Sequence, residues 1–595
     1  MSSAPRTRLI MPTVVFGLGV AGLFLLPNHL LYAGSAAMWY GVVGLGMYLP
    51  MAALRELPLN AAGLTGLAAY LFAFVAGKGG VESWVLATAV AIGTVVAVSV
   101  LGGLASLRVT GLYFAVATLV VQMAIEKTVF PIGELTGGAG GRGVDQPDFS
   151  GWFNTNRAVY LIAGVVCLVV SVAVWYTKRT RLVSQWVMTG HQPEGADAVG
   201  IRRWIHKLVV FVLSGALLGI AGCLAAFVNG TPPPVFQFGV IWSVILLAIP
   251  LASGMRTVSS VWLVAAGFTA IPILLESQRI NPNFLSAGIL LFALVSARGQ
   301  AVVMARLRRA GTVWDLPQVA ALGTAPPAPA VPSGSTRAPA LVFGQSQLDD
   351  LRSRVLGGDG IGVYFGGVRA VDGVDIRVGP GQRVALMGSN GAGKTTLLNA
   401  LCGFVPLSRG RVTLGDADIT AMPPYARARS GVGRTFQLPR LAEVLTVRQN
   451  IESWHGYSSA MAERAEWLME RFWVGYVADV PVDMLSFGFR RRVELVRALV
   501  SRPDVLLLDE PVGGLEDEEV ARLSQVILEL QAEEGWGLLL IEHNLDFVQA
   551  VADHLMVMQN GVLIAQGSIA DVWEDERVRR VYLGETMPAQ TADAV

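Results

Sequence analysis

This sequence of 595 residues contains little charge. Asp, Glu, Lys and Arg make up only 15% of it, whereas 53% is hydrophobic and the mean hydropathy is +0.53. That balance excludes a fully soluble chain and an intrinsically disordered one. The net charge is only +1, so no overall positive field draws the chain to nucleic acid. Three scattered cysteines are too few for a disulfide framework or a zinc site, and we expect buried, reduced thiols.

Long apolar runs fill the first half of the chain. A membrane-spanning helix needs about 20 mostly apolar residues. Ten candidate runs occur, at 9–26, 30–54, 61–77, 81–107, 111–130, 158–176, 207–228, 238–254, 258–276 and 284–297. With the N-terminus inside, fifteen Lys and Arg face the inner side and five the outer side, in agreement with the positive-inside rule. We predict a polytopic α-helical membrane domain over 1–310, with a span count good to one or two.

Two alternatives concern individual apolar runs of this domain. The third, eighth and last runs are short or glycine-rich, so one of them could be re-entrant. A cleaved signal peptide over residues 1–35 is the other alternative, although its removal would spoil the agreement with the charge rule.

The composition changes class after residue 310. The segment 311–345 has a core rich in Pro, Ala and Ser (Thr324–Ala340), which cannot build a hydrophobic core and is typical of a linker. Residues 346–595 have the composition of a soluble protein. We therefore predict a second domain there, with a disordered loop inside one domain as the alternative for the linker.

One string in the second domain predicts a phosphate-binding loop. RVALMG (Arg383–Gly388) predicts a short strand, and G-x-x-x-x-G-K-[ST] and a helical sequence follow it. The glycines let backbone N–H groups turn toward phosphate oxygens at a helix N-terminus. Lys394 would reach the β- and γ-phosphates, and Thr395 would ligate Mg²⁺. The predicted ATP-binding residues here are Gly388, Ser389, Asn390, Gly391, Ala392, Gly393, Lys394, Thr395 and Thr396.

Two later buried strands end in side chains suited to phosphate chemistry. One ends in Asp509, a second magnesium ligand, and Glu510, a base that would orient the attacking water. The other ends in His543, for which a surface histidine without a role is the alternative. Gln437 follows Lys394 by 43 residues and would sense the γ-phosphate or the metal. We predict a catalytic set of Glu510, His543 and Gln437, and a metal set of Thr395, Gln437 and Asp509.

Three further segments predict local structure. Met484–Val500 predicts a glycine turn and an amphipathic helix with an arginine cluster (Arg490, Arg491, Arg492) near its start. Cations there oppose the helix dipole, so we expect anions from outside the domain to relieve the cost. The Asn-Gly turn within Leu555–Gly567 predicts a hairpin. Gly138–Gly143 fits G-x-G-x-x-G but lies between two predicted spans, so we interpret it as a loop.

The loop 177–206, between two predicted spans on the inner side, is strongly basic. Within it, Pro193–Ile201 predicts a short helix that ends at a glycine, bracketed by Glu194 and Gly200. A docking helix that carries force from the soluble half is one interpretation, and a solvated connector is the other.

Taken in order, the phosphate loop, RTFQ, LSFGF, LLLDE and IEH resemble an ATP-binding-cassette ATPase over residues 350–585. The resemblance implies an α/β P-loop ATPase that hydrolyses ATP with Mg²⁺. It also implies that two cassettes clamp two nucleotides, with a signature segment completing the site of the partner cassette. Carried over by position, that segment is Ser486, Phe487 and Gly488. His543 would be the switch histidine, and Phe365 would stack on adenine.

Both halves resemble the importers of branched-chain amino acids. FGGVRAVDGVDI, GRTFQ and RVYLGE are similar to their cassette, and LRVTGLYFAVATL, LTGGAGGRG and EGADAVGI to their permease. The resemblance places Glu194 and Gly200 on the cassette-docking loop. It implies an ATP-driven importer of the cytoplasmic membrane, with its ATPase domain in the cytoplasm. The expected partners are a second permease and cassette (or a second copy), an extracellular or periplasmic binding protein and membrane lipid, with no nucleic acid.

Three departures from the family pattern stand out. Phe489 replaces a polar residue, usually Gln, in the signature, and Glu516 replaces Asp or Asn shortly after the carboxylates Asp509 and Glu510. The stretch between Gln437 and Ser486 is also short. We therefore hypothesise that the site using this signature is the weaker of two, so that Phe489→Gln would raise ATPase activity.

Three other functions remain open. An importer of urea or short amides would use the same permease type. An exporter half-transporter would normally have about six long spans that reach far into the cytoplasm, unlike the ten short-looped runs here. An ATP-gated channel or an ATPase sensor would turn over ATP without accumulating a solute.

Overall fold

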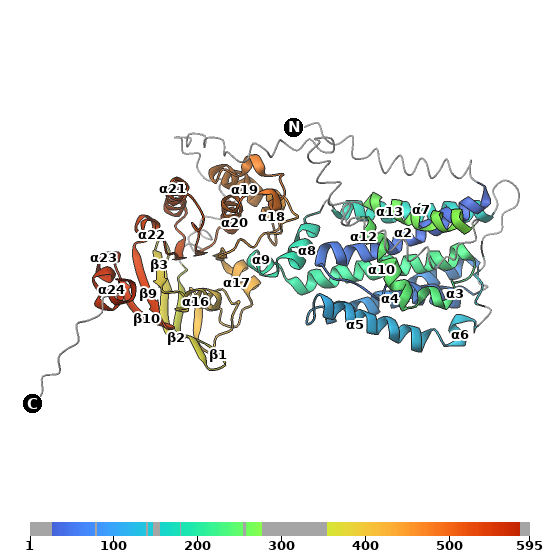
Figure 1. Ribbon diagram of the computed structural model, residues 1–595, viewed down its shortest axis with the longest axis horizontal. Coiled ribbons are helices and arrows are strands. Elements are labelled where there is room, and N and C mark those ends of the chain that lie inside the picture. The colour runs from blue at the N-terminus through green and yellow to red at the C-terminus, as the bar shows by residue number, and fades with distance from the viewer. Residues whose placement is uncertain are drawn as a thin grey trace, which may run out of the picture. The chain divides into compact units, whose positions relative to one another are not determined.

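The computed structural model describes residues 27–276 and 354–583, apart from 78–79, 139–140, 145, 147–154, 179 and 254–257. The chain divides into two compact units (Figure 1). The first, which we call the helical unit, comprises the residues up to Trp186 and those from Trp204 to Ala325. The second, the cassette unit, comprises residues from Pro326 onward together with Val187–Arg203. That short segment lies by sequence within the predicted membrane domain.

The helical unit consists of helices that run side by side in Figure 1. They are α2 (Asn28–Leu54), α3 (Ala61–Ala76), α4 (Gly80–Ala105), α5 (Leu112–Ala124) with a π-helical extension (Ile125–Val129), α6 (Gly133–Thr136), α7 (Thr155–Lys178), the start of α8 (Arg181–His191), α10 (Arg203–Asn229), a 3₁₀ turn (Val235–Phe238), α11 (Val240–Leu246), α12 (Ala248–Ala252) and α13 (Val258–Glu276). One apolar core joins most of them, centred on side chains such as Val42, Leu64 and Leu224.

All eight predicted spans that fall within the described residues coincide with apolar helices. Five stretches are long and apolar enough to cross a membrane: four lie within α2, α4, α7 and α10, and the fifth is α5 together with its π-helical extension. The runs predicted at 61–77 and 238–254 are shorter helices, and the second of them is divided between α11 and α12. The runs 9–26 and 284–297 and the predicted linker lie outside the described residues.

A polar stripe on α5 and its π-helical extension holds the starts of the shorter helices. Thr118, Gln122 and Glu126 lie four residues apart and therefore share one helix face. Thr118 Oγ1 accepts the Leu59 N–H just before α3 (3.0 Å), and Gln122 Oε1 accepts the Gly63 N–H (2.6 Å). Glu126 Oε2 accepts the Val240 N–H at the start of α11 (2.9 Å). Neither α3 nor α11 has a side-chain cap of its own, so this stripe satisfies N–H groups that helix starts leave free.

The cassette unit contains two sheets. The antiparallel sheet has the order β2-β1-β4-β5, from β1 (Leu356–Phe365), β2 (Val368–Val378), β4 (Arg409–Leu414) and β5 (Ala417–Asp418). The second sheet has the order β10-β9-β3-β8-β7-β6, from β3 (Arg383–Gly388), β6 (Val432–Arg434), β7 (Val505–Asp509), β8 (Gly537–Ile541), β9 (His554–Gln559) and β10 (Val562–Gly567). Only β10 pairs antiparallel there.

The strands β7 and β8 are buried along their whole length, as near-continuous apolar runs in a parallel sheet should be. The carboxyl ends of β3, β7 and β8 therefore bring Gly388, Asp509 and Ile541 to one edge of the sheet. The predicted hairpin is also confirmed, because Asn560 and Gly561 both have positive φ (51° and 83°) between β9 and β10.

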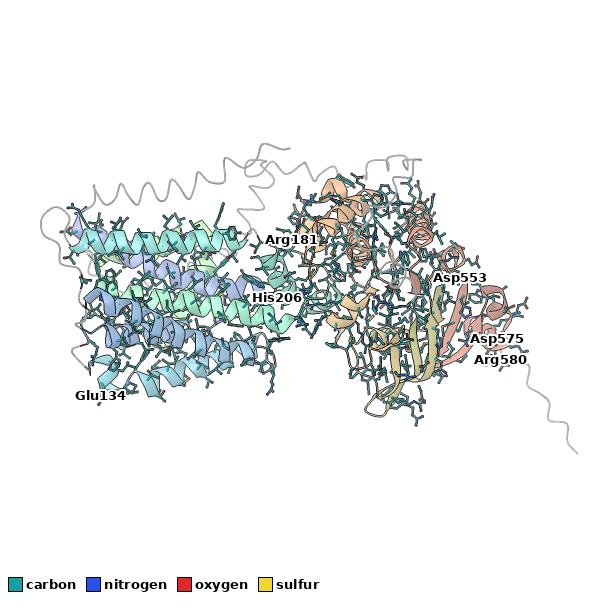
Figure 2. The ribbon with its side chains drawn as sticks, turned by 180° about the vertical axis from the view of Figure 1, so that it is seen from behind. Glu134, Arg181, His206, Asp553, Asp575 and Arg580 are labelled. Carbon is teal, nitrogen blue, oxygen red and sulfur yellow. The ribbon has the colours of Figure 1, made fainter. Side chains whose placement is uncertain are left out.

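Helices complete the cassette unit (Figure 1). They are α9 (Pro193–Ala198), α16 (Lys394–Leu401), α17 (Pro424–Ser430), α18 (Val447–Glu452), α19 (Ser459–Arg471), α20 (Phe487–Leu499), α21 (Asp517–Glu534), α22 (Leu545–Val551), α23 (Ile569–Glu574) and α24 (Glu576–Leu583). Ion pairs between neighbouring residues reinforce the last helix, where Asp575 pairs with Arg577 and Arg580 with Glu576 (Figure 2). The segment expected to be short, between Gln437 and Ser486, retains α18 and α19.

Candidate functional site

The predicted phosphate loop joins β3 to α16. Gly393 has φ +99°, and a Cβ there would lie 2.2 Å from the Ala370 carbonyl oxygen, so only glycine fits. The Lys394 ammonium donates to the carbonyl oxygens of Gly388 (2.8 Å) and Ser389 (3.0 Å), and so lies folded along the loop. Burial lowers the pKa of Lys394, although the carboxylates of Glu510 and Asp509 oppose that shift.

The three residues predicted to be catalytic meet at the edge of the second sheet. Gln437 Nε2 donates to Glu510 Oε2 (3.0 Å), and His543 Nε2 lies 3.5 Å from Glu510 Oε1. Glu510 has φ +49°, an uncommon conformation for a residue other than glycine. Its N–H donates to the Ile541 carbonyl of β8 (2.9 Å), which holds this strained turn in place.

Asp509 lies one residue earlier and is buried, with 1% of its surface exposed. Its Oδ2 lies 3.8 Å from the buried Arg434 guanidinium, and its Oδ1 has no hydrogen-bond partner. Burial raises the pKa of Asp509, and Arg434 acts in the opposite direction. A buried carboxylate oxygen without a partner beside a phosphate loop suits a hard cation such as Mg²⁺, which prefers oxygen ligands.

A pocket of about 500 Å³ collects most of these groups. Its lining runs through the phosphate loop, the start of α16, the tip of the β9–β10 hairpin and the three predicted catalytic residues. The lining residues are Val368, Arg369, Ala370, Asn390, Gly391, Ala392, Gly393, Lys394, Thr395, Thr396, Gln437, Glu510, His543, Asn560 and Gly561.

Seven of the predicted ATP-binding, metal and signature residues do not line this pocket. Three of them directly precede lining residues in the sequence: Gly388 and Ser389 precede Asn390, and Asp509 precedes Glu510. Phe365 ends β1 opposite Val368 and is 51% exposed, so the adenine-stacking role predicted for it stays a prediction. Ser486 and Phe487 are exposed at the start of α20, and Gly488 follows them. Their position outside their own chain's pocket agrees with a role in completing another cassette's site.

The arginine cluster on α20 differs from the expectation. All three side chains have acceptors within the chain, so no outside anion is needed. Arg490 donates to the Leu485 carbonyl (3.1 Å), Arg491 to the Gln437 carbonyl (2.5 Å) and Arg492 lies 3.5 Å from the carboxylate of Glu519. The sequence could not predict this, because some of these acceptors are far from the arginines in the sequence and are brought close only by the fold.

Phe489 is buried, with 7% of its surface exposed. Its ring meets the Tyr476 ring edge-on, with centroids 5.9 Å apart, and the Arg492 guanidinium lies 4.3 Å from its centroid. The side chain is therefore part of the packing beneath α20. Glu516, the second departure, is the exposed N-cap residue of α21 and makes no capping bond with its side chain.

The predicted docking helix, α9, packs within the cassette unit. Glu194 Oε2 lies 2.9 Å from Arg440 Nε, and the Gly200 carbonyl accepts from Arg429 Nε (2.7 Å). The His455 N–H donates to the Val199 carbonyl (3.0 Å). These contacts and the burial of Gly195–Ala198 contradict the solvated-connector alternative, and the docking role stays a prediction.

Some residues of the site escaped the sequence analysis. Glu542, at the end of β8, accepts the N–H groups of Val512 (3.0 Å), His543 (2.7 Å) and Asn544 (3.2 Å), and so fixes the turn that carries His543. An acidic residue after a buried strand is the signal that could have identified it. Arg440 had no such signal, because its partner Glu194 is distant in sequence.

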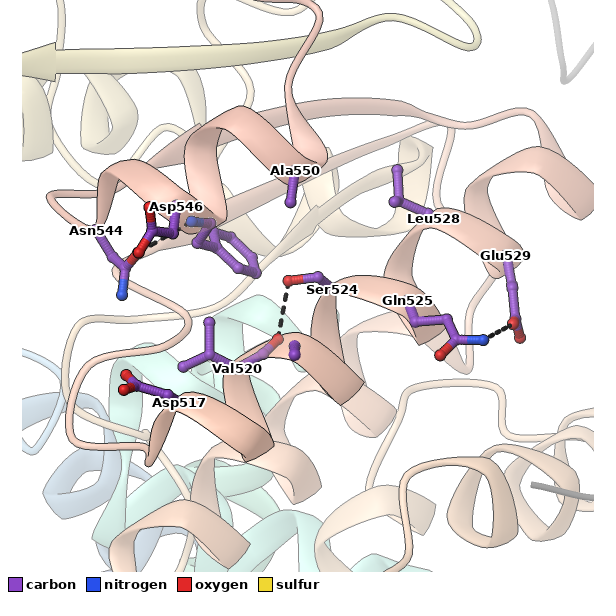
Figure 3. A pocket seen from close by; sticks show the side chains of 11 residues that line it. Asp517, Val520, Ser524, Gln525, Leu528, Glu529, Asn544, Asp546 and Ala550 are labelled. Carbon is purple, nitrogen blue, oxygen red and sulfur yellow. Dashed lines mark hydrogen bonds between the residues drawn. The ribbon is translucent and has the colours of Figure 1, made fainter. Parts of the chain in front are cut away.

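A second hollow, of about 550 Å³, lies between α21 and α22 (Figure 3). Its lining is acidic and apolar and includes the carboxylates of Asp517, Glu529 and Asp546, so it does not suit a triphosphate. Its polar groups partly satisfy each other, since Ser524 donates to the Val520 carbonyl (2.8 Å) and Gln525 to Glu529 (2.9 Å).

Two family models match the chain. The model described as "ABC transporter" matches residues 371–513, and the model described as "Branched-chain amino acid transport system / permease component" matches residues 30–296. The two matches do not overlap, and they divide between the N-terminal helical region and the C-terminal region with the phosphate loop.

Individual proteins match the C-terminal region. The lipopolysaccharide export system ATP-binding protein LptB of Escherichia coli K12 is 37% identical over 37% of this chain and 93% of its own length. The high-affinity branched-chain amino acid transport ATP-binding protein LivG of the same organism is 34% identical over 38% of this chain and 96% of its own length. A solved nucleotide-free ATP-binding cassette from an ABC transporter is 34% identical over 39% of this chain and all of its own length, with a TM-score of 0.36.

Proposed function

This chain belongs to the ABC transporters, with a permease of the branched-chain amino acid transport type and an ATP-binding cassette in one polypeptide, and from that premise we propose that it imports branched-chain amino acids or similar small polar solutes. It is a membrane protein that hydrolyses ATP. Beyond family membership, one observation supports coupling between the permease part of the sequence and the ATP site. The docking helix α9, from the permease part of the sequence, contacts Arg440, three residues after the Gln437 that touches Glu510.

In the proposed reaction, the phosphate loop binds the triphosphate of ATP through its backbone N–H groups, and Lys394 turns from its loop carbonyls to the β- and γ-phosphates. Glu510 orients a water molecule for attack on the γ-phosphate and accepts its proton. Gln437 holds one carboxylate oxygen of Glu510, which leaves the other free to face the water and His543.

Mg²⁺ would be held by Thr395, Gln437 and Asp509, and would neutralise charge on the β- and γ-phosphates. In the part of the chain that the structure describes, no group of three His, Cys, Asp or Glu side chains could hold a metal ion unaided. That fits Mg²⁺, which proteins usually bind with one or two carboxylates together with substrate phosphates.

The proposed transport cycle needs a second cassette. Ser486, Phe487 and Gly488 lie outside their own pocket and are available to a nucleotide on that second cassette. The second permease and cassette would come from a second copy of this chain or from different subunits. A binding protein outside the membrane would deliver the solute, and lipid would surround the apolar helices.

We further propose the cytoplasmic membrane as the location, with the cassette in the cytoplasm. In the helical unit, Glu134 of α6 lies at one end, and Arg181 and His206 lie at the other (Figure 2). The basic end is the one joined to the docking helix, which agrees with the positive-inside rule. Import is favoured over export because the permease part of the chain matches a branched-chain permease, whereas the export protein LptB matches only the cassette.

Transport assays with sealed vesicles test solute and direction together. The complex, with its binding protein, is placed in vesicles whose cassettes face inward, with ATP inside and labelled leucine, urea or acetamide outside. Accumulation of leucine supports the proposal. Accumulation of urea or acetamide alone would replace the solute class, and ATP-driven loss of preloaded solute would reverse the direction.

A further inference from the structure

The segment Phe436–Arg440 lies between the ATP site and the docking helix. Gln437, its second residue, donates to Glu510 (3.0 Å), and Arg440, its last, lies 2.9 Å from Glu194. The Arg440 carbonyl also lies close to α9, since a Cβ at Gly195 would come within 2.4 Å of it. If this segment shifts as a rigid body, the contact of Gln437 with Glu510 and the contact of Arg440 with Glu194 therefore change together.

A single buried carboxylate fixes both ends of this segment. Glu494, on α20, is fully buried. Its Oε2 accepts the Phe436 N–H (3.2 Å), and its Oε1 accepts the Arg440 N–H (2.8 Å). Pro439 lies between these two points and further restricts the backbone.

Two buried arginines on the same helix hold the carbonyl groups of the segment. Arg491 donates to the carbonyls of Phe436 and Gln437, and Arg497 donates to that of Arg440 (2.6 Å). Both also flank Glu494, with nitrogen–oxygen distances of 3.6 and 3.4 Å. The backbone N–H and carbonyl groups at both ends of the segment are therefore hydrogen-bonded to one helix, α20. This helix begins at the signature residues.

Stability alone does not explain this arrangement. Burying three charged side chains carries a large desolvation cost, and well-packed apolar side chains of similar volume often stabilise a protein equally well. What the charged cluster provides, and apolar packing does not, is a fixed register for the backbone N–H and carbonyl groups that carry Gln437 and Arg440.

We propose that Glu494 is a positioning residue that makes Phe436–Arg440 move as one body, so that the state of the ATP site and the position of the docking helix are coupled. This inference rests on the proposed function, because it takes Glu510 as the hydrolytic base and α9 as the docking helix. It adds a residue that touches neither the nucleotide nor the permease part of the chain.

The test is the number of solute molecules moved per ATP hydrolysed by the full complex in vesicles, for wild type and Glu494→Gln. The amide keeps one acceptor oxygen, loses the other and loses the charge. We expect ATP binding within about threefold of wild type and a fall of about tenfold in the transport ratio, within the usual range of coupling between sites.

Glu534→Gln is the matched control. Glu534 pairs with the fully buried Arg464 (2.8 Å between Oε2 and Nη2) in the same unit and contacts neither the segment nor the pocket. A purely structural effect lowers transport and ATP turnover together in both variants and leaves the ratio unchanged. That outcome for Glu494→Gln would overturn the proposal.

A second measurement needs no transported solute. If Glu494 couples the two places, Glu194→Arg changes the ATP turnover of the complex in the wild-type background but not in the Glu494→Gln background. Equal effects in both backgrounds contradict the proposal even where the solute has been misassigned. If Glu494→Gln fails to fold, Glu494→Asp keeps the charge and reaches only one of the two N–H groups, and the same two comparisons apply.

Discussion

The side-chain amide of Gln437 donates a hydrogen bond to the carboxylate of Glu510, with Nε2 and Oε2 3.0 Å apart. These residues come from distant parts of the sequence, one after β6 and the other at the end of β7. Their contact joins the proposed hydrolytic base to the segment that reaches the docking helix.

The close approach of α9 to Arg440 predicts a strong effect of a single methyl group. Gly195→Ala places a Cβ 2.4 Å from the Arg440 carbonyl oxygen, so one of the two must shift. We expect ATP-driven transport to fall by about fivefold or more, as for a typical loss of coupling between sites, while ATP affinity is unchanged.

Gly133→Ala is the control for that experiment. Gly133 begins another short helix, α6, and a Cβ there meets no atom within 4 Å. Transport that falls equally in both variants, or in neither, would show that the α9 contact does not matter for transport.

The substitution Phe489→Gln has two predicted effects, one on ATPase activity and one on stability. The family pattern suggests that Phe489→Gln raises ATPase activity. The packing against Tyr476 and Arg492 predicts instead a loss of about 3 kcal/mol in the free energy of unfolding, because a buried aromatic ring is removed. Thermal unfolding and ATP turnover of the same preparation separate the two.

Leu545→Gln serves as the exposed control for Phe489→Gln. Leu545 is 43% exposed, and surface substitutions usually change stability by less than about 0.5 kcal/mol. Higher ATP turnover from Phe489→Gln with unchanged stability would refute the packing account and favour the weaker-site hypothesis.

Asp504 predicts a pH dependence of stability. Burial raises its pKa to about 6, although Arg354 lies 3.0 Å away and opposes the shift. The folded state then holds more protons than the unfolded state between the unfolded pKa near 4 and the folded pKa near 6. The free energy of unfolding therefore falls as pH rises through this window and changes no further above it.

Asp504→Asn cannot titrate and removes this contribution. We expect the variant to gain about 2 kcal/mol relative to wild type between pH 4.5 and pH 7, measured by chemical unfolding at both pH values. A constant difference between the two proteins across this range contradicts the raised pKa.

The polar stripe on α5 predicts the effect of removing one amide. Gln122 is fully buried, accepts the Gly63 N–H and donates to the Phe238 carbonyl (2.7 Å). Gln122→Leu leaves both groups without that partner, which we expect to cost about 2 kcal/mol and to lower the thermal unfolding midpoint of the helical unit. Thr94→Val is the control, because Thr94 is half-buried and its exposed hydrogen bond goes to the Val90 carbonyl of its own helix (2.9 Å). If both variants lower the thermal unfolding midpoint equally, the hydrogen bonds of the polar stripe do not stabilise the helical unit.

Local patterns carried most of what the sequence predicted correctly. The phosphate loop is contiguous, so its strand, glycine turn and helix are readable from one string, and the eight described apolar runs form helices because hydropathy alone decides them. Pairings between distant residues were not readable. Glu494 holds Phe436 and Arg440 from another helix, and the inward direction of Phe489 depends on how α20 packs. The prediction that outside anions pair with the arginine cluster was wrong for the same reason, since acceptors such as Gln437 and Glu519 lie elsewhere in the chain.

The most direct test of the central claim is ATP-dependent uptake of labelled leucine by vesicles that contain this chain, its partner subunits and the binding protein. Glu510→Gln is the control, since it keeps the side-chain shape and removes the proposed base. The account predicts uptake by wild type, and ATP binding with neither hydrolysis nor uptake by the variant. ATP hydrolysis by wild type without uptake of any amino acid, urea or amide would contradict it.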